Sequence, residues 1–292
     1  MTPTIGVFDS GFGGLTVLRA LMKRIPQARF AFLGDTARLP YGSKSRRTIS
    51  RYAAESAQFL VREQGAQFLV IACNTASALA LDAIEEAVAG IPVLGVIEPG
   101  ASAARAASKT GDVLVIATDA TVQSHAYAAA CARLGLRALE KACPLLVPLV
   151  EEGWVGPLAA AEGDEAHAAL AAFAPPQVAV TAEVIRIYLA ELISDAAQQG
   201  LNPDVLVLGC THYPLLRPLI EAAVPKGMRV IDSAEAAAEV ALVRFGAAAA
   251  AVPQGETALR CFATDSVEKF ERLGSRFLGQ AVGQVELVDL GG

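Results

Sequence analysis

The stretch VLVLGCTHYP, residues 205–214, decides the fold of this chain. Its first four residues are aliphatic and typical of a buried strand, Gly209 and Cys210 follow where that strand ends, and Pro214 suits an early helical position. A counterpart, FLVIACNT at residues 68–75, repeats the order of apolar strand, small residue, cysteine and polar side chains. Because α/β proteins bind ligands where strand ends open onto helices, the two stretches predict one site shared by two similar halves.

Apolar runs alternate with helix-like segments along the rest of the chain. Further strands are predicted at residues 5–8, 30–33, 92–97, 113–117, 136–139, 229–232 and 259–262. Helices are predicted at residues 15–24, 49–60, 75–88, 122–133, 182–199 and 234–245, and the Ala-rich stretch 156–174 is also expected to be helical. This alternation predicts an α/β fold of two similar lobes, each a mainly parallel sheet covered by helices, with the active site in the cleft between them.

The boundary between the lobes is predicted at Glu98-Pro99-Gly100, because Pro and Gly together favour a break in regular structure. We expect residues 1–98 plus about 208–292 to form the first lobe and about 99–207 the second. Residues 143–154 are apolar and rich in proline, and we expect them to form a loop that ends near two carboxylates.

Composition excludes several classes of protein. The 292 residues are 53% hydrophobic and 18% charged, as in an ordinary globular chain. A net charge of −6 argues against a nucleic acid or an anionic membrane as a partner attracted by bulk electrostatics. The first residues lack the basic and apolar regions of a signal peptide, and apolar runs stay below the roughly 18 residues that a membrane span needs. We therefore expect a cytoplasmic protein.

The five cysteines are odd in number and widely spaced, which is not typical of a disulfide framework. Cys131, Cys143 and Cys261 are interpreted as small buried hydrophobic residues. Cys73 and Cys210 lie in matched motifs, each before a predicted helix whose N-terminus lowers the pKa of a neighbouring thiol. We expect both of these thiols to be partly ionised.

Two such thiols on opposite sides of a cleft predict two-base proton transfer at one carbon, with inversion of that centre. Asp9 and His212 follow the same strand ends, where they would assist proton movement or bind an ammonium group, or else cap a turn and pack in the core. A metal site at Cys210 and His212 lacks the usual paired cysteines. Acyl transfer by the same two residues leaves Cys73 without a role. A dinucleotide site at the glycine-rich turn that begins at Gly11 is disfavoured, because its third glycine would fall on Thr16.

Six motifs spread over nearly the whole chain resemble those of the glutamate racemases, the cofactor-independent members of the aspartate/glutamate racemase superfamily. They are VFDSG at 7–11, DTAR and PYG within 35–42, ACNTA at 72–76, GVIEPG at 95–100, PLVE at 148–151 and LGCTHYP at 208–214. The resemblance implies that Cys73 and Cys210 are the catalytic acid/bases, with Asp9, His212 and Glu151 as further catalytic groups.

The same resemblance implies a set of substrate-binding residues, namely Asp9, Ser10, Tyr41, Gly42, Asn74, Thr75, Thr121, Thr211 and His212. Ala120 stands where relatives often have glycine, and the choice of Glu151 over Glu152 rests on its position after Leu149-Val150. Glutamate is the implied small-molecule substrate, with no cofactor, no metal, no nucleic acid and no membrane, and D-glutamate is supplied for peptidoglycan synthesis. A homodimer is left open.

Two other functions stay open on the sequence alone. A racemase of the same superfamily that acts on aspartate or a related amino acid shares the two-thiol logic but should lack the combined PYG and THYP motifs. A two-lobed module that binds an amino acid without turning it over would be expected to carry serine at one of the two cysteine positions. For catalysis, the chain must stabilise a carbanion-like state through local hydrogen-bond donors and the exclusion of water, for which closure of the lobes is the expected device.

Overall fold

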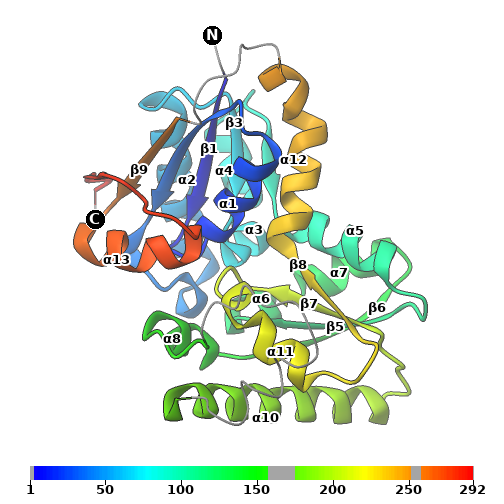
Figure 1. Cartoon of the computed structure of the whole chain (residues 1–292). Coiled ribbons are helices and arrows are strands. Elements are labelled where there is room, and N and C mark those ends of the chain that lie inside the picture. Colours follow the sequence, from blue (N-terminus) through cyan, green and yellow to red (C-terminus); the bar gives the residue numbers. More distant parts are fainter. Residues whose placement is uncertain (1–2, 157–174, 251–257, 292) are drawn as a thin grey trace.

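The computed structural model of the chain describes residues 3–156, 175–250 and 258–291, which contain two sheets (Figure 1). The first sheet has the order β10-β9-β2-β1-β3-β4 and the second the order β6-β5-β7-β8, and every pair of neighbouring strands is parallel. The strands are β1 (Thr4–Asp9), β2 (Arg29–Gly34), β3 (Phe68–Ile71), β4 (Val93–Gly95), β5 (Asp112–Ala117), β6 (Arg137–Ala142), β7 (Val205–Gly209), β8 (Arg229–Asp232), β9 (Leu259–Ala263) and β10 (Val285–Leu287). The predicted fold class is confirmed.

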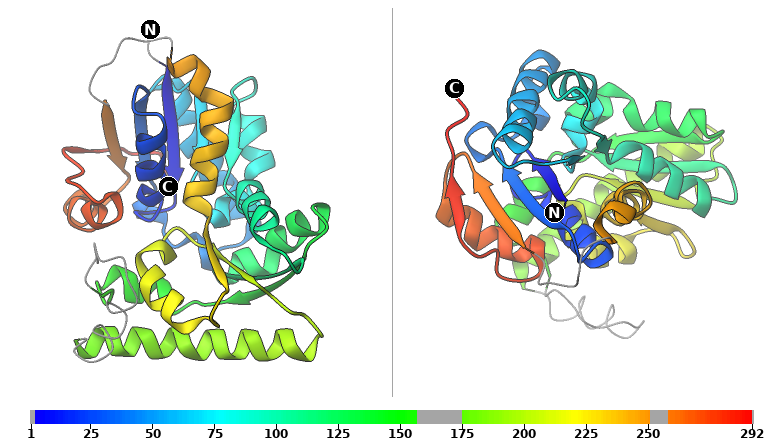
Figure 2. Two further views of the ribbon diagram at one scale, coloured as in Figure 1. Left: turned by 45° about the vertical axis from the view of Figure 1, so that its right-hand side comes forward. Right: turned by 90° about the horizontal axis from the view of Figure 1, so that it is seen from above.

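Helices pack on both sheets and join them (Figures 1 and 2). They are α1 (Leu15–Arg24), α2 (Arg46–Arg62), α3 (Asn74–Leu79), α4 (Leu81–Ala87), α5 (Ile97–Ala107), α6 (Asp119–Ser124), α7 (Ala126–Arg133), α8 (Leu146–Glu151), α10 (Pro176–Gln198), α11 (Arg217–Ala223), α12 (Ser233–Ala250) and α13 (Val267–Leu278), with short 3-10 turns η1 (Thr36–Arg38), η2 (Tyr41–Ser43) and η3 (Tyr213–Leu216). Every residue of β5 and of β7 is buried, because helices cover both faces of a parallel sheet. This burial explains the continuous apolar runs in the sequence.

The alanine-rich helix α12 leads from the second sheet back to the first lobe, where it packs beside α1 (Figure 2). Its buried positions include Ala234, Ala237, Ala238 and Ala241. Small side chains let two helices approach closely, so this alanine stripe is a packing surface between lobes. Aromatic packing of Phe245 on Phe68 of β3, with ring centroids 4.5 Å apart, extends the same contact.

The sequence predicts that the chain returns to the first lobe near residue 208. Both β7 and β8 pair within the second sheet. We propose that the second lobe runs from the start of α5 to the end of β8, and that α12 makes the return. The run at 205–209 indicates a buried strand in either lobe, because sheet membership depends on long-range pairing that periodicity does not encode.

Two predicted irregular segments are wrong for one physical reason. The expected break at Glu98-Pro99-Gly100 lies inside α5, and the expected loop at 143–154 contains α8 with Pro148 in its first turn. Proline is tolerated in the first turn because the N–H that it lacks has no intrahelical acceptor there. The segments predicted as single helices at 75–88 and 122–133 are each divided into two, with His125 in the left-handed region at the second division.

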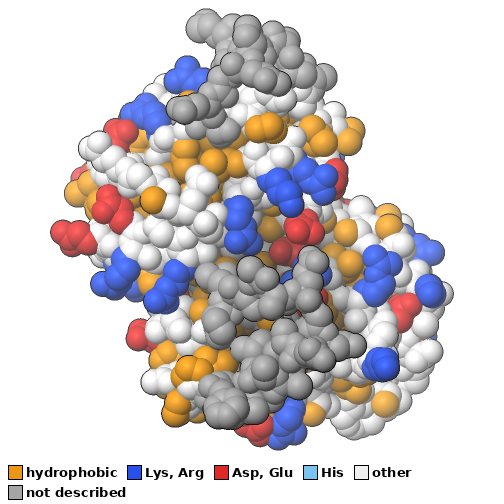
Figure 3. Space-filling view, in the orientation of Figure 1, with side chains coloured by type: hydrophobic (Ala, Val, Ile, Leu, Met, Phe, Trp, Pro, Cys, Tyr) orange, Lys and Arg blue, Asp and Glu red, His pale blue; other side chains and the backbone are white. Residues whose placement is uncertain are grey.

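Helix α13 and strand β10 were not predicted, although α13 has the strongest separation of apolar and polar residues among the longer described helices. The helix predicted within 156–174 lies outside the described residues, apart from residue 156. On the face seen in Figure 3, acidic and basic side chains are interspersed over both lobes. Among the helices of the described ranges, none has the length and apolar character that crossing a bilayer requires.

Candidate active site

The carboxyl ends of four strands from both sheets meet at one cleft. Asp9 ends β1 and Cys73 follows β3 in the first lobe, whereas Thr118 follows β5 and Cys210 follows β7 in the second. The cleft encloses about 270 Å³ and is lined by Ser10, Gly11, Leu39, Pro40, Tyr41, Gly42, Ser43, Cys73, Asn74, Thr75, Thr118, Asp119, Pro144, Val147, Pro148, Glu151, Cys210, Thr211 and His212. A parallel sheet places its ligand site at this edge, and the two cysteine motifs share one pocket as the sequence predicts.

Cys73 is the N-cap residue of α3 and is 5% exposed. Its thiol donates to Ser10 Oγ at 3.4 Å, and its sulfur accepts from the backbone N–H of Ala76 at 3.4 Å. Burial raises the pKa of the Cys73 thiol to about 12, and the nearby Asp9 adds to the rise. The expectation of a partly ionised Cys73 is therefore wrong, because burial outweighs the short helix α3.

Asp9 lies just behind the pocket wall and is 1% exposed. Its Oδ2 accepts from the Gly11 N–H at 3.0 Å, while Oδ1 is buried and has no hydrogen-bond partner among the described residues. Burial raises the pKa of Asp9, against the lowering effects of His212 and of the N–H groups of Gly14 and Gly11. The first-lobe side of the pocket thus joins a protonated thiol to a carboxyl group whose proton affinity is increased.

His212 links Cys210 to a carboxylate on the second-lobe side. His212 Nδ1 lies 3.9 Å from Cys210 Sγ, and His212 Nε2 lies 3.3 Å from Glu151 Oε1. Burial lowers the pKa of His212, but its contacts with Cys210 and Glu151 outweigh burial and raise it to about 10. At neutral pH this imidazole is a cation that lies between Cys210 and the Glu151 carboxylate.

Glu151, not Glu152, is the carboxylate at the site. Burial raises the pKa of Glu151, but hydrogen bonding and charge from His212 and from Lys269 outweigh it, so that the pKa lies below its usual value. Glu151 Oε2 is 3.5 Å from Lys269 Nζ, whereas the Glu152 side chain is exposed at the end of α8. Lys269 belongs to α13, which lies above α8 in the view of Figure 1, and sequence reasoning missed it.

Three threonine hydroxyls form hydrogen bonds between the two lobes beside the cleft. Thr75 Oγ1 of α3 lies 3.0 Å from Thr118 Oγ1 and 3.2 Å from Thr121 Oγ1, and the latter two are 3.0 Å apart. Thr118 lines the pocket, whereas Thr121 is fully buried behind it. The structure therefore adds Thr118 to the candidate residues, and places Thr121 as a support for Thr75 and Thr118. The strand-end position of Thr118, directly after β5, was the available signal.

Tyr41 and Gly42 contribute the loop between β2 and α2. The Tyr41 hydroxyl donates to Asp35 Oδ2 at 2.5 Å, and Arg38 Nε donates to the same carboxylate at 2.8 Å. The Tyr41 hydroxyl is thus committed to a buried network with Asp35 and Arg38. A Cβ on Gly42 would lie 3.2 Å from Thr118 Cβ, so this loop packs closely on the second lobe.

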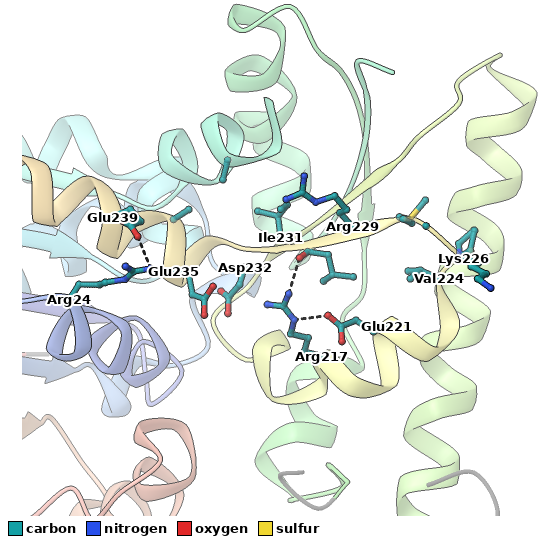
Figure 4. Close-up of a pocket in the computed structure, with 16 residues that line it drawn as sticks. Arg24, Arg217, Glu221, Val224, Lys226, Arg229, Ile231, Asp232, Glu235 and Glu239 are labelled. Atoms are coloured by element: carbon teal, nitrogen blue, oxygen red, sulfur yellow. Dashed lines mark hydrogen bonds and ion pairs between the residues drawn. The ribbon is translucent and has the colours of Figure 1, made fainter. Parts of the chain in front are cut away.

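A larger cavity of about 620 Å³ lies on another side of the molecule, between α1, α11, β8 and α12 (Figure 4). Four of its charged side chains pair within the lining, Arg24 with Glu239 at 2.6 Å and Arg217 with Glu221 at 2.7 Å. By contrast, the cleft is lined by two thiols and by Asn74, whose buried Nδ2 has no hydrogen-bond partner among the described residues. The cleft is therefore the candidate catalytic site, although it is the smaller of the two.

Comparisons with known proteins agree with this assignment. A family described as Asp/Glu/hydantoin racemase matches residues 15–186. The curated glutamate racemase of Koribacter versatilis (strain Ellin345) is 50% identical over 312 residues, covering 99% of this chain and 98% of the relative.

Two solved structures extend the likeness to three dimensions. Glutamate racemase from Francisella tularensis in complex with D-glutamate is 33% identical, with a TM-score of 0.80 over 99% of this chain and 98% of the other. Glutamate racemase from Thermus thermophilus in complex with β-chloro-D-alanine is 40% identical, with a TM-score of 0.78 over 99% of this chain and 97% of the other.

Proposed function

This chain belongs to the Asp/Glu/hydantoin racemase family, and we propose that it interconverts L- and D-glutamate by two-base proton transfer at the α-carbon. The observation that supports this proposal is the pairing of Cys73 and Cys210, which enter one pocket from different sheets. The relatives named above are glutamate racemases, and the likeness to this chain covers 97% or more of each of them. Cys73 and Cys210 are the proposed acid/bases, with Asp9, His212 and Glu151 as supporting groups.

The two thiols take different parts in the proposed first step. Cys73 keeps its proton because of burial and the nearby Asp9, and Cys210 faces the cationic His212. The enantiomer whose α-proton faces Cys210 loses that proton to the Cys210 thiolate, and the carbanion then takes the Cys73 proton on its opposite face. The other enantiomer runs through the same steps in reverse, after a proton has moved from the first side to the second.

The substrate brings two carboxylates and an ammonium group into a chain of net charge −6, so it must be held by local donors. Ser10, Asn74, Thr75, Thr118 and Thr211 supply hydroxyl and amide groups around the pocket. Such donors, held in place before reaction and sheltered from water, stabilise developing negative charge more strongly than bulk water does. We infer that these groups, not a cofactor, hold the carbanion-like state.

The product D-glutamate is the form that the resemblance to the family links to peptidoglycan synthesis, and we propose that role here. A cytoplasmic location and a homodimer stay predictions.

The test is incubation of the purified chain with L-glutamate in D₂O, without added pyridoxal phosphate or metal. We expect loss of optical rotation together with deuterium uptake at the α-carbon, because protons enter from solvent-exchanged thiols. Deuterium uptake and loss of rotation with aspartate but not with glutamate would favour the sister racemase. Binding of glutamate, measured by calorimetry, without any exchange would favour a non-catalytic binding module and overturn the proposal.

A further inference from the structure

The Asn74 side chain has two chemically different ends in two different environments. It is 3% exposed and lines the cleft next to Cys73. Asn74 Oδ1 accepts a hydrogen bond of 2.7 Å from the Tyr127 hydroxyl, whereas Nδ2 is buried without a partner among the described residues. An amide presents either a donor or an acceptor to a ligand, depending on which end its protein partner holds. The partner of Asn74 therefore decides what this residue offers to the substrate.

Tyr127 belongs to α7 of the second lobe, outside the pocket lining, and is fully buried. Its ring fits between two glycines, since a Cβ on Gly100 would lie 3.2 Å from one ring carbon and a Cβ on Gly209 would lie 3.0 Å from another. The phenol is thus confined by its surroundings. Burial raises the pKa of Tyr127 above its usual value, so the hydroxyl keeps its proton and can donate it.

A second hydroxyl, that of Ser233, neighbours the same phenol. Ser233 donates its own proton to the Leu208 carbonyl at 3.2 Å. The phenol donates its proton to Asn74 Oδ1, and this leaves Nδ2 without a partner among the described residues. An N–H is the group that binds a carboxylate.

We propose that Tyr127 is a positioning residue that holds the Asn74 amide so that Nδ2 donates to a carboxylate of the amino-acid substrate. The contact joins α3 of the first lobe to α7 of the second, so the donor is oriented by the lobe that carries Cys210. This inference rests on the proposed racemisation of glutamate, and it assigns to a residue behind the pocket a part in binding a substrate carboxylate.

The first test is Tyr127→Phe, which removes the hydroxyl and keeps the ring between its two glycines. We expect the KM for glutamate to rise about tenfold with kcat changed by less than about twofold, because a carboxylate contact made equally in ground and transition states affects KM alone. Tyr188→Phe is the matched control, because that tyrosine lies on α10 away from the cleft and its hydroxyl only accepts from the Leu145 N–H at 3.4 Å. An unchanged KM in Tyr127→Phe would overturn the inference.

A double-mutant cycle separates positioning from a general structural role. In an Asn74→Ala background, Tyr127→Phe should have no further effect on KM, because the group that it orients is gone. Effects that multiply independently would instead show that Tyr127 acts through the fold, and would overturn the inference.

The orientation of the amide is tested by Asn74→Asp, which replaces Nδ2 by oxygen and keeps an acceptor for the phenol. We expect a larger rise in KM than in Tyr127→Phe, because two carboxylates then face one another. Glutamate binding as tight as in the unchanged protein would overturn the orientation. The protein without substitutions is assayed in parallel. If it does not racemise glutamate, the proposed function fails. If it does, and Tyr127→Phe has the same KM, only this inference is rejected.

Discussion

The two sides of the cleft carry the same reactive group in opposite electrostatic settings. Cys73 lies near Asp9, and the pKa of its thiol is raised to about 12 by burial and by that carboxyl. Cys210 lies 3.9 Å from His212, whose pKa is raised to about 10 and whose far nitrogen meets Glu151. Cys73 therefore has an acidic neighbour, whereas Cys210 has a cationic imidazole beside it.

This difference teaches how a symmetric reaction can start from an asymmetric site. Racemisation needs one base and one acid at any moment, so two identical thiols in identical surroundings would be poorly matched to the first step. We propose that the different surroundings of Cys73 and Cys210 divide these two roles before substrate binds, and that the roles exchange as the proton crosses. Each prediction below alters one side and asks whether the other side keeps its character.

The largest effect is expected from removal of either thiol. Cys73→Ala and Cys210→Ala should each lower racemisation by about 10²–10⁴-fold, the range for loss of a general acid or base. In D₂O, each variant should still exchange the α-proton of one enantiomer without inversion, and the two variants should act on opposite enantiomers. NMR of the α-proton measures this directly, and exchange of the same enantiomer by both would contradict the assignment of one thiol to each face.

Cys131→Ala is the control for loss of a cysteine. Cys131 is a buried residue of α7, outside the pocket lining. Its replacement should leave kcat/KM unchanged while the free energy of unfolding falls by about 1 kcal/mol, as is usual for a buried truncation.

An intermediate effect is expected from Glu151→Gln. In the unchanged protein the pKa of His212 is about 10, above its usual value of 6.5, so the imidazole stays charged between those two limits. Loss of the Glu151 charge lowers that pKa, and the alkaline limb of kcat/KM should move to lower pH. A fall of about one unit would reduce activity about tenfold above the new limb. A pH profile of kcat/KM measures the shift, and an unmoved alkaline limb would separate Glu151 from the function of His212.

Glu152→Gln is the matched control for this change, because Glu152 is the next residue and its side chain is exposed. The same chemical change there should leave the pH profile in place. A shift of equal size in both variants would point to overall charge instead of the contact with His212.

The smallest effect is expected from Lys269→Met. Lys269 is 43% exposed and lies 3.5 Å from Glu151 across the cleft, and exposed ion pairs contribute at most about 1 kcal/mol. The pKa of Glu151 is lowered in part by Lys269, so its removal should raise that pKa and move the acid limb to higher pH. We expect kcat/KM to fall by less than about fivefold. Added salt should shrink the difference between the two proteins, and a salt-independent loss would mean that Lys269 acts through packing.

The local sequence predicted an element correctly wherever its apolar periodicity was compatible with only one kind of secondary structure. The strands before Cys73 and Cys210 and the helix at 15–24 follow from apolar periodicity, and α1 has the predicted bounds. The segments around Pro99 and Pro148 were misjudged, because a proline signals a break in mid-helix and is harmless in a first turn. Which of the two applies depends on where the helix begins, and that depends on packing.

The sequence alone determined the fold class, the two cysteines and the identity of most pocket residues, because strand periodicity and family motifs are local properties of the chain. Only the tertiary structure decided the sheet to which Cys210 belongs, the choice of Glu151 over Glu152, and the parts of Lys269 and Tyr127. These depend on which distant groups meet and on how deeply they are buried. The protonation of Cys73 is the clearest case: a helix N-terminus predicts an ionised thiol, and burial beside Asp9 in the folded chain reverses that prediction.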